Sequence, residues 1–208
     1  MLKIESVTVG PYEVNSLIVW CEDTMEAVLF DPGAEAYRLL ARIDKLDLIM
    51  RRVIITHGHA DHIGEISVVL AGNKVPLSIH KLDRPKLTDP EKNLSAFIGP
   101  PIIAPDADDM IEEGDLIKIG NRSLRAIHVP GHSQGSLCFY GDGILISGDT
   151  LFNRGIGRTD FPDSNESDLH SAIRTKLYIL PEDTVVYPGH GPTTTIGDER
   201  EYNPFVRA

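Results

Sequence analysis

The sequence predicts an α/β fold in which two β-sheets pack face to face and helices cover their outer sides. Strand-like alternation of apolar and polar residues recurs in two separate halves of the chain, and helix-like segments follow in each half. With 208 residues, of which 41% are hydrophobic, the chain is long enough to bury a sizeable core. We therefore expect one globular domain that spans residues 1–208.

The first half begins with three short strands and then alternates helices with strands. Leu39, Leu40, Ile43 and Leu46 recur at helical spacing, which predicts a helix with one apolar face. The apolar run that follows has the character of a buried strand. The expected strands are residues 3–10, 15–22, 26–33, 51–56 and 75–80, and the expected helices are residues 36–47 and 62–72.

The second half repeats this alternation after a proline-rich interruption. Prolines at 85, 90, 100, 101 and 105 exclude long regular elements, so residues 85–110 should form a long loop with short helical turns. This loop is expected to be either a binding loop lined by Phe97, Ile98, Ile102 and Ile103 or an ordered surface crossing. The remaining expected strands are residues 115–120, 123–129, 135–141, 143–149 and 184–189, and the remaining helix is residues 166–180.

Composition excludes several classes of function. Thirty-one acidic and 20 basic residues give a net charge of −11, which argues against a nucleic-acid partner. The chain has neither an apolar run of membrane length nor the pattern of a signal peptide, so we expect a cytoplasmic protein without a membrane partner. Cys21 and Cys138 lie in apolar runs and are expected to be buried free thiols. Nothing in the sequence indicates the oligomeric state.

The stretch Thr-His-Gly-His-Ala-Asp-His-Ile-Gly, residues 56–64, places four potential metal ligands in one strand-to-helix turn. Residues two apart in an extended segment point the same way, so His57, His59 and Asp61 are expected to converge. Asp61 is also placed to cap the next helix, which would leave His62 in its first turn. Burying several imidazoles beside a carboxylate is costly without a cation.

Three further segments each supply one group of the same kind after a strand and beside a glycine. They contribute His132, Asp149 and His190. One zinc ion takes three or four ligands, so these seven groups suit two ions with a bridging carboxylate. Imidazole and carboxylate ligands without thiolate favour zinc, iron or manganese over a soft metal. We therefore expect two divalent ions, with zinc as the first choice and iron and manganese as alternatives. The remaining histidines, His80, His128 and His170, lack this context and are expected to be structural.

The pattern His-x-His-x-Asp-His followed by widely spaced His, Asp and His resembles the metallo-β-lactamase superfamily over nearly the whole chain. The resemblance implies a four-layer αββα sandwich with a dinuclear site along one edge. It assigns the first ion to His57, His59 and His132, the second to Asp61, His62 and His190, and Asp149 to both. The resemblance also implies that Asp61 and Asp149 are the catalytic carboxylates.

Two stretches are most similar to short glyoxalase II-like hydrolases, which cleave thioesters such as S-lactoylglutathione. These stretches are residues 148–162 and residues 187–205. The sequence Gly-Arg-Thr-Asp-Phe at 157–161 is shared with mononuclear-iron persulfide dioxygenases, but those enzymes carry Pro-Ala-His-Asp where this chain has Pro-Gly-His-Gly around His190. The expected function is therefore thioester hydrolysis by a metal-bound hydroxide. The alternatives are persulfide oxidation and hydrolysis of another ester, lactone or amide.

One departure from the glyoxalase II pattern concerns the thiol carrier. The full-length enzymes have a C-terminal helical domain that holds glutathione, and this sequence ends 18 residues after His190. The expected partner is a small-molecule thioester whose thiol the sequence does not identify. Arg158 is either an anion contact or, as the favoured alternative, a partner of Asp160 that braces its loop.

Overall fold

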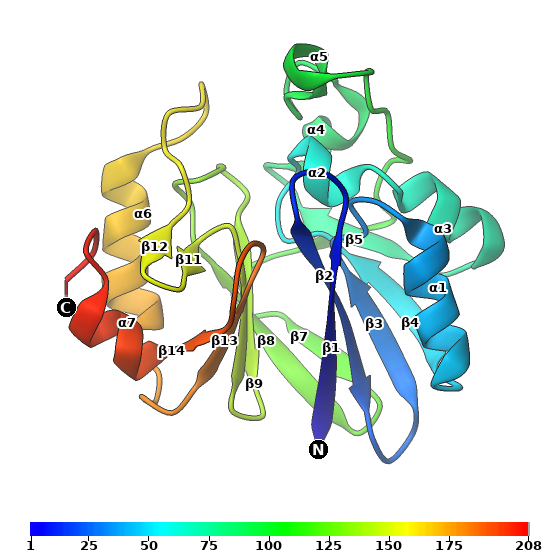
Figure 1. Cartoon of the computed structure of the whole chain (residues 1–208), viewed down its shortest axis with the longest axis horizontal. Helices are drawn as coiled ribbons and strands as arrows, with labels where there is room; N and C mark the ends of the chain where they lie inside the picture. The colour runs from blue at the N-terminus through cyan, green and yellow to red at the C-terminus, as the bar shows by residue number, and fades with distance from the viewer. Residues whose placement is uncertain (208) are drawn as a thin grey trace.

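The computed structural model describes residues 1–207, which form two six-stranded sheets with helices on their outer sides (Figure 1). One sheet has the strand order β1-β2-β3-β4-β5-β6 and the other has the order β14-β13-β10-β9-β8-β7, while β11 and β12 form a separate hairpin. The strands are β1 (Leu2–Val9), β2 (Val14–Cys21), β3 (Glu26–Phe30), β4 (Ile49–Ile54), β5 (Leu77–His80), β6 (Asp109–Ile111), β7 (Leu116–Ile119), β8 (Arg122–His128), β9 (Leu137–Gly141), β10 (Ile144–Gly148), β11 (Leu151–Phe152), β12 (Gly155–Ile156), β13 (Val185–Pro188) and β14 (Thr194–Thr195). The helices are α1 (Ala36–Lys45), α2 (Ala60–Ile63), α3 (Ile66–Gly72), α4 (Arg84–Thr88), α5 (Ser95–Ile98), α6 (Glu166–Ala172) and α7 (Ile196–Tyr202), with a π-helical turn η1 (Ile173–Leu177) after α6.

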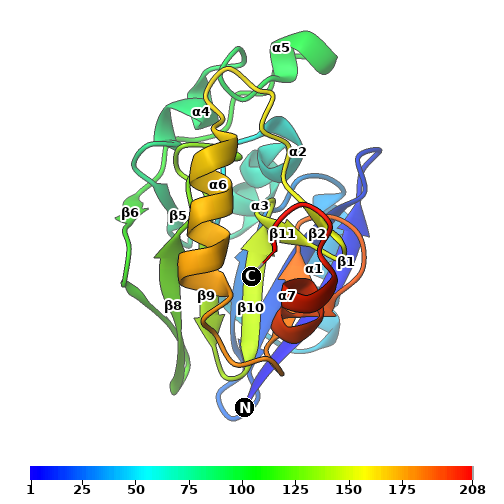
Figure 2. The ribbon, with the colours of Figure 1, turned by 90° about the vertical axis from the view of Figure 1, so that its left-hand side faces the viewer.

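Three apolar clusters hold these elements together as layers. The central cluster lies between the two sheets, where the ring centroids of Phe30 and Phe139 are 5.2 Å apart. A second cluster includes Leu39 of α1 and packs this helix and α3 on the first sheet; a third includes Leu169 and Ile196 and packs α6 and α7 on the second. Figures 1 and 2 show the helices outside both sheets. The predicted four-layer αββα sandwich is therefore confirmed.

The strand patterns follow from how each strand is covered. β2 pairs along its whole length with β1, from Leu2 opposite Cys21 to Val9 opposite Val14, and nearly all its side chains are buried. Both faces of β2 are therefore covered by protein, which explains why apolar residues occur on both of them. The edge strand β7 instead alternates exposed and buried side chains, because one of its faces meets solvent.

Strand direction gathers the chemically interesting loops at one rim of the sandwich. β3, β4 and β5 are parallel neighbours in the first sheet, and β10 and β13 are parallel neighbours in the second. Parallel strands end at the same edge of a sheet, so the loops that follow them lie together. Polar residues placed directly after these strands therefore meet across the rim.

The predicted helix over residues 62–72 is two helices, α2 and α3. The amide of Glu65 donates to the carbonyl of Pro32 at 3.0 Å, which takes it out of the helical pattern. At Gly64 a Cβ atom would overlap the carbonyl oxygen of Gly33, so only glycine fits where these two loops cross. Asp61 does not cap the helix as predicted, because His59 occupies the N-cap and Asp61 lies in the first turn.

The remaining expectations are mostly met. The segment 85–110 contains only the short helices α4 and α5, although β6 begins at its end. Cys21 and Cys138 are buried free thiols, as predicted. The expected helix 166–180 forms as α6 and η1, whereas α7, β11, β12 and β14 were not predicted. Within residues 1–207, no helix combines the length and the apolar character needed to cross a membrane. The single domain and the cytoplasmic location stay predictions.

Candidate metal centre

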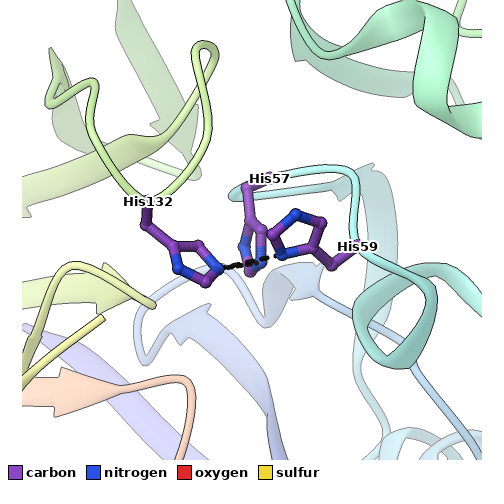
Figure 3. Close-up of side chains that lie close together, drawn as sticks. All are labelled: His57, His59 and His132. Atoms are coloured by element: carbon purple, nitrogen blue, oxygen red, sulfur yellow. Dashed lines mark hydrogen bonds between the residues drawn. The ribbon is translucent and has the colours of Figure 1, made fainter. Parts of the chain in front are cut away.

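Three histidine side chains from two loops converge at the rim. His57 and His59 lie in the loop after β4, and His132 lies in the loop after β8 (Figure 3). His132 Nε2 is 3.1 Å from His57 Nε2 and 2.9 Å from His59 Nδ1. Ligands about 2.0–2.1 Å from a tetrahedral zinc ion lie roughly 3.3 Å from one another. These three nitrogens are therefore spaced as the ligands of one metal ion would be.

A second group lies beside the first. His190 Nε2 is 3.3 Å from Asp61 Oδ2, and His62 Nε2 is 3.8 Å from the same oxygen. Asp61 therefore joins His62 and His190, and it lines the same cavity as His59. The helical turn at Ala60 rotates Asp61 away from the direction that an extended segment would give it.

Asp149, directly after β10, lies between the two groups. Its Oδ2 atom is 3.7 Å from His132 Nε2 and 3.5 Å from His190 Nε2, and its Oδ1 atom is 3.4 Å from His62 Nε2. Gly189 makes this approach possible, because a Cβ atom there would overlap Asp149 Oδ1. The structure thus brings all seven predicted residues to one rim, with Asp149 placed to serve both groups.

Burial keeps the first group neutral. It lowers the pKa of His57 and of His59 well below the usual value, and the neighbouring imidazoles add to this effect. The pKa of His132 is lowered too, again mainly by burial. Neutral imidazoles keep a lone pair available, which is the form that binds a metal ion.

The second group is rich in negative charge. Burial lowers the pKa of His62, but the carboxylates of Asp149 and Asp61 outweigh burial and raise it well above the usual value. The same carboxylates outweigh burial at His190 and raise its pKa to about 9. In the ion-free chain, imidazolium protons balance the carboxylates, a role that a divalent cation can take over.

Two buried atoms show directly that the donor set fits a cation. Among residues 1–207, His62 Nε2 and Asp149 Oδ1 are both buried and have no hydrogen-bond partner. A buried polar atom without a partner is costly, and both atoms face the centre of the second group. A bound metal ion would satisfy both of them.

Asp31, a buried carboxylate after β3, orients His62. It accepts hydrogen bonds from the Thr56 amide and hydroxyl, each 2.7 Å long, and its Oδ2 atom is 2.9 Å from His62 Nδ1. His62 thus donates through Nδ1 and keeps Nε2 free for a ligand bond. Asp31 falls within the expected strand 26–33, and its local sequence gives no signal for this role.

Asp83, a second buried carboxylate, ties together the two loops that carry the first group. Its oxygens accept from the amide of Gly58 at 2.8 Å, from the hydroxyl of Ser133 at 2.7 Å and from the amide of Gly135 at 2.8 Å. Its position before Arg84-Pro85 resembles only a helix start, so the sequence offered no signal for this role.

Replacing Asp83 with alanine is expected to loosen the first group. The change leaves the buried amides of Gly58 and Gly135 unpaired at roughly 1–3 kcal/mol each, while the Ser133 hydroxyl keeps its contact with Ser136, so we expect the unfolding free energy of the metal-free chain to fall by about 2 kcal/mol or more. The affinity of the first group for its metal ion should fall as well. Denaturant unfolding and chelator competition measure the two effects, with the exposed Asp106→Ala as control. An unchanged metal affinity in Asp83→Ala would contradict this role.

The centre opens into a cavity of about 300 Å³, here called the metal cavity. Its lining includes His59, Asp61, Asp149, His190, Phe152 and Phe161. From the 85–110 segment it also includes Ile98, whereas Phe97 and Ile103 are exposed, so the predicted apolar lining is only partly right.

Cations near the metal cavity are already paired. Arg158 binds Asp160 through two hydrogen bonds of 2.8 and 2.9 Å, which confirms the favoured interpretation of this residue. The buried amine of Lys86 is 2.7 Å from Asp163 Oδ2 and 3.4 Å from His59 Nε2. Lys86 was not among the predicted site residues. Neither cation is left free for an anionic substrate.

The other histidines stay outside the centre, as predicted. The rings of His80 and His128 stack at 4.2 Å, and burial lowers the pKa of His80 to about 4. His170 lies one helical turn from Glu166, with 3.8 Å between Nε2 and Oε1.

The family model for the metallo-β-lactamase superfamily matches residues 9–190. The chain is 35% identical to the hydroxyacylglutathione hydrolase GloC of Haemophilus influenzae, over 100% of this chain and 99% of that protein. Among solved structures, it is similar to the BLEG-1 B3 metallo-β-lactamase, with 36% identity, full coverage of both chains and a TM-score of 0.93. It is also similar to TTHA1623 in a di-iron-bound form, with 34% identity, coverage of 97% and 100%, and a TM-score of 0.87.

Proposed function

The chain belongs to the metallo-β-lactamase superfamily and is a metallo-hydrolase of that superfamily, and we propose that it cleaves thioesters of the S-lactoylglutathione type. The observation that carries this proposal is the pair of ligand groups joined by Asp149 at the base of the metal cavity. Similarity to GloC along both whole chains supports a thioester as the substrate, because GloC is named for that activity.

In this proposal the residues of the centre hold two divalent ions. The first ion is held by His57, His59 and His132, the second by Asp61, His62 and His190, and Asp149 binds both. Nitrogen and oxygen donors without thiolate favour zinc, iron or manganese. We keep zinc as the first choice, and the similarity to a di-iron protein supports iron as the alternative.

Such ions, when bound, supply Lewis acidity that makes water a nucleophile at neutral pH and polarises a carbonyl oxygen. The protein's own groups complete the reaction. Asp61 lines the metal cavity and is placed to orient the attacking water through its carboxylate. Phe152 and Phe161 add apolar rings to the lining of the cavity beside the ligand groups. Asp31 keeps the His62 ring in one orientation throughout.

S-lactoylglutathione itself is expected to be a weakly bound substrate. Arg158 is the single Lys or Arg in the described lining of the metal cavity, and Asp160 already neutralises it. Weak binding of the glutathione carboxylates raises KM and leaves the chemical step largely intact. We expect a KM near or above about 1 mM, the top of the usual range, in steady-state assays of metal-loaded protein. A low-micromolar KM that depends on the glutathione carboxylates would contradict this expectation.

Parallel assays on one metal-loaded preparation test the proposed reaction against its rivals. They measure cleavage of S-lactoylglutathione, oxygen uptake with glutathione persulfide, and opening of a β-lactam ring. We expect thioester cleavage to dominate. Oxygen uptake without thioester cleavage would replace the proposal with persulfide oxidation, and preferential β-lactam opening would replace it with amide hydrolysis, the activity in the name of BLEG-1.

A further inference from the structure

A second cavity opens beside the metal cavity, and we propose that it receives the acyl group of the substrate and favours longer apolar chains. This inference rests on the proposed thioester hydrolysis. The cavity, here called the side cavity, measures about 260 Å³ and lies between the β1–β2 turn, the start of α2 and the segment 95–102. Tyr12, Ala60, Asp61 and Ile98 line both cavities, so the two adjoin at these residues.

The walls of the side cavity suit an apolar ligand. Its lining contains no Lys, Arg or His within the described chain, and Asp61, at the junction with the metal cavity, is its one carboxylate. The hydroxyl of Ser95 is already engaged, because it accepts a hydrogen bond from the Ile102 amide at 2.9 Å. A charged group placed here would lose its hydration without gaining a partner. Methylene groups placed here would gain by leaving water.

The polarity of the two cavities indicates which part of a thioester enters each of them. The scissile carbonyl must lie at the ligand groups, so the acyl chain and the thiol carrier leave it in different directions. Carriers of the glutathione class bear carboxylates and amides, which the apolar side cavity cannot satisfy. The lining of the metal cavity has more polar and charged side chains than that of the side cavity, so it suits a polar carrier better. The side cavity is left for the acyl chain.

Two small residues keep the side cavity open. Gly10, in the β1–β2 turn, has a left-handed φ of 69°, and a Cβ atom there would lie 2.9 Å from Ala34 Cβ. Ala34 is half-buried and lines the cavity. A larger side chain at position 34 would fill space that an acyl chain needs. Ala34 is therefore the position at which chain-length preference can be changed.

The test compares acetyl, butanoyl and hexanoyl thioesters of one small uncharged thiol, N-acetylcysteamine, with metal-loaded protein. Each buried methylene is worth roughly a fourfold gain, and butanoyl has two more methylenes than acetyl, so kcat/KM should rise about 15-fold from acetyl to butanoyl. In Ala34→Leu the hexanoyl-to-acetyl ratio of kcat/KM should fall by about tenfold or more. Ala41→Leu, the same change at an exposed position of α1, should keep the wild-type ratio.

Calorimetry gives a readout that does not depend on turnover. Ketone analogues, in which CH₂ replaces the thioester sulfur, should bind with an increasingly negative heat-capacity change as the acyl chain lengthens, and Ala34→Leu should abolish that trend. Thioester cleavage without a preference for acyl-chain length would overturn the acyl assignment and leave the proposed function standing. Failure to cleave any thioester would overturn both.

Discussion

Replacing Asp149 with alanine is expected to remove both metal ions and nearly all hydrolytic activity. Its two oxygens lie 3.4–3.7 Å from ligand nitrogens of both groups, so this side chain touches both ions in the proposed centre. Metal ions supply several kcal/mol of transition-state stabilisation, and we expect kcat/KM to fall by about 10³-fold or more.

Metal analysis after dialysis and the thioester assay measure this effect together. The matched control is Asp168→Ala, an exposed aspartate on α6 that should leave both readings at the wild-type level. Circular dichroism checks that the variant folds. Substantial turnover by folded, metal-free Asp149→Ala would show that catalysis does not depend on this centre.

Replacing His62 with alanine should separate the two ions. His62 belongs to the second ligand group, while His57, His59 and His132 stay intact in the first. Even the loss of a residue that only orients a ligand costs 10–100-fold in metal affinity, so losing a ligand should weaken the second ion by about 100-fold or more. The first ion should change much less.

Chelator competition resolves the two affinities in each variant. His132→Ala is the complementary change and should weaken the first ion more, whereas His170→Ala, a histidine outside the centre, should weaken neither. Equal loss of both ions in His62→Ala would mean that the two groups do not bind separately.

Much of the fold and the ligand set could be predicted because both depend on local sequence. Alternation predicts strands, and each ligand lies in the segment that follows a strand, at most eight residues after its end. The residues that orient the ligands could not be found in this way. Asp31 contacts His62 across 31 positions, and Asp83 contacts Ser133 across 50. Such pairs exist only after the sheets have assembled.

The C-terminal segment was missed for a similar reason. α7 is short and mostly polar, yet its buried Glu199 accepts from the amide of Arg154, the hydroxyl of Thr194 and the side chain of Asn203. Asn203 also donates to the carbonyl of Gly155 at 3.1 Å. This cluster ties α7 to the β11–β12 hairpin, which carries Phe152 into the metal cavity. Local hydrophobic periodicity gives no signal for this polar cluster.

The metal content of the wild-type protein tests the central claim most directly. Two groups of three ligands with Asp149 between them predict two ions per chain once the protein is fully loaded with zinc, iron or manganese. Elemental analysis of protein purified without chelator, before and after titration with each metal, gives this number. A value of two at saturation is the expected result. Saturation at one ion per chain would contradict the dinuclear centre and with it the proposed hydrolytic mechanism.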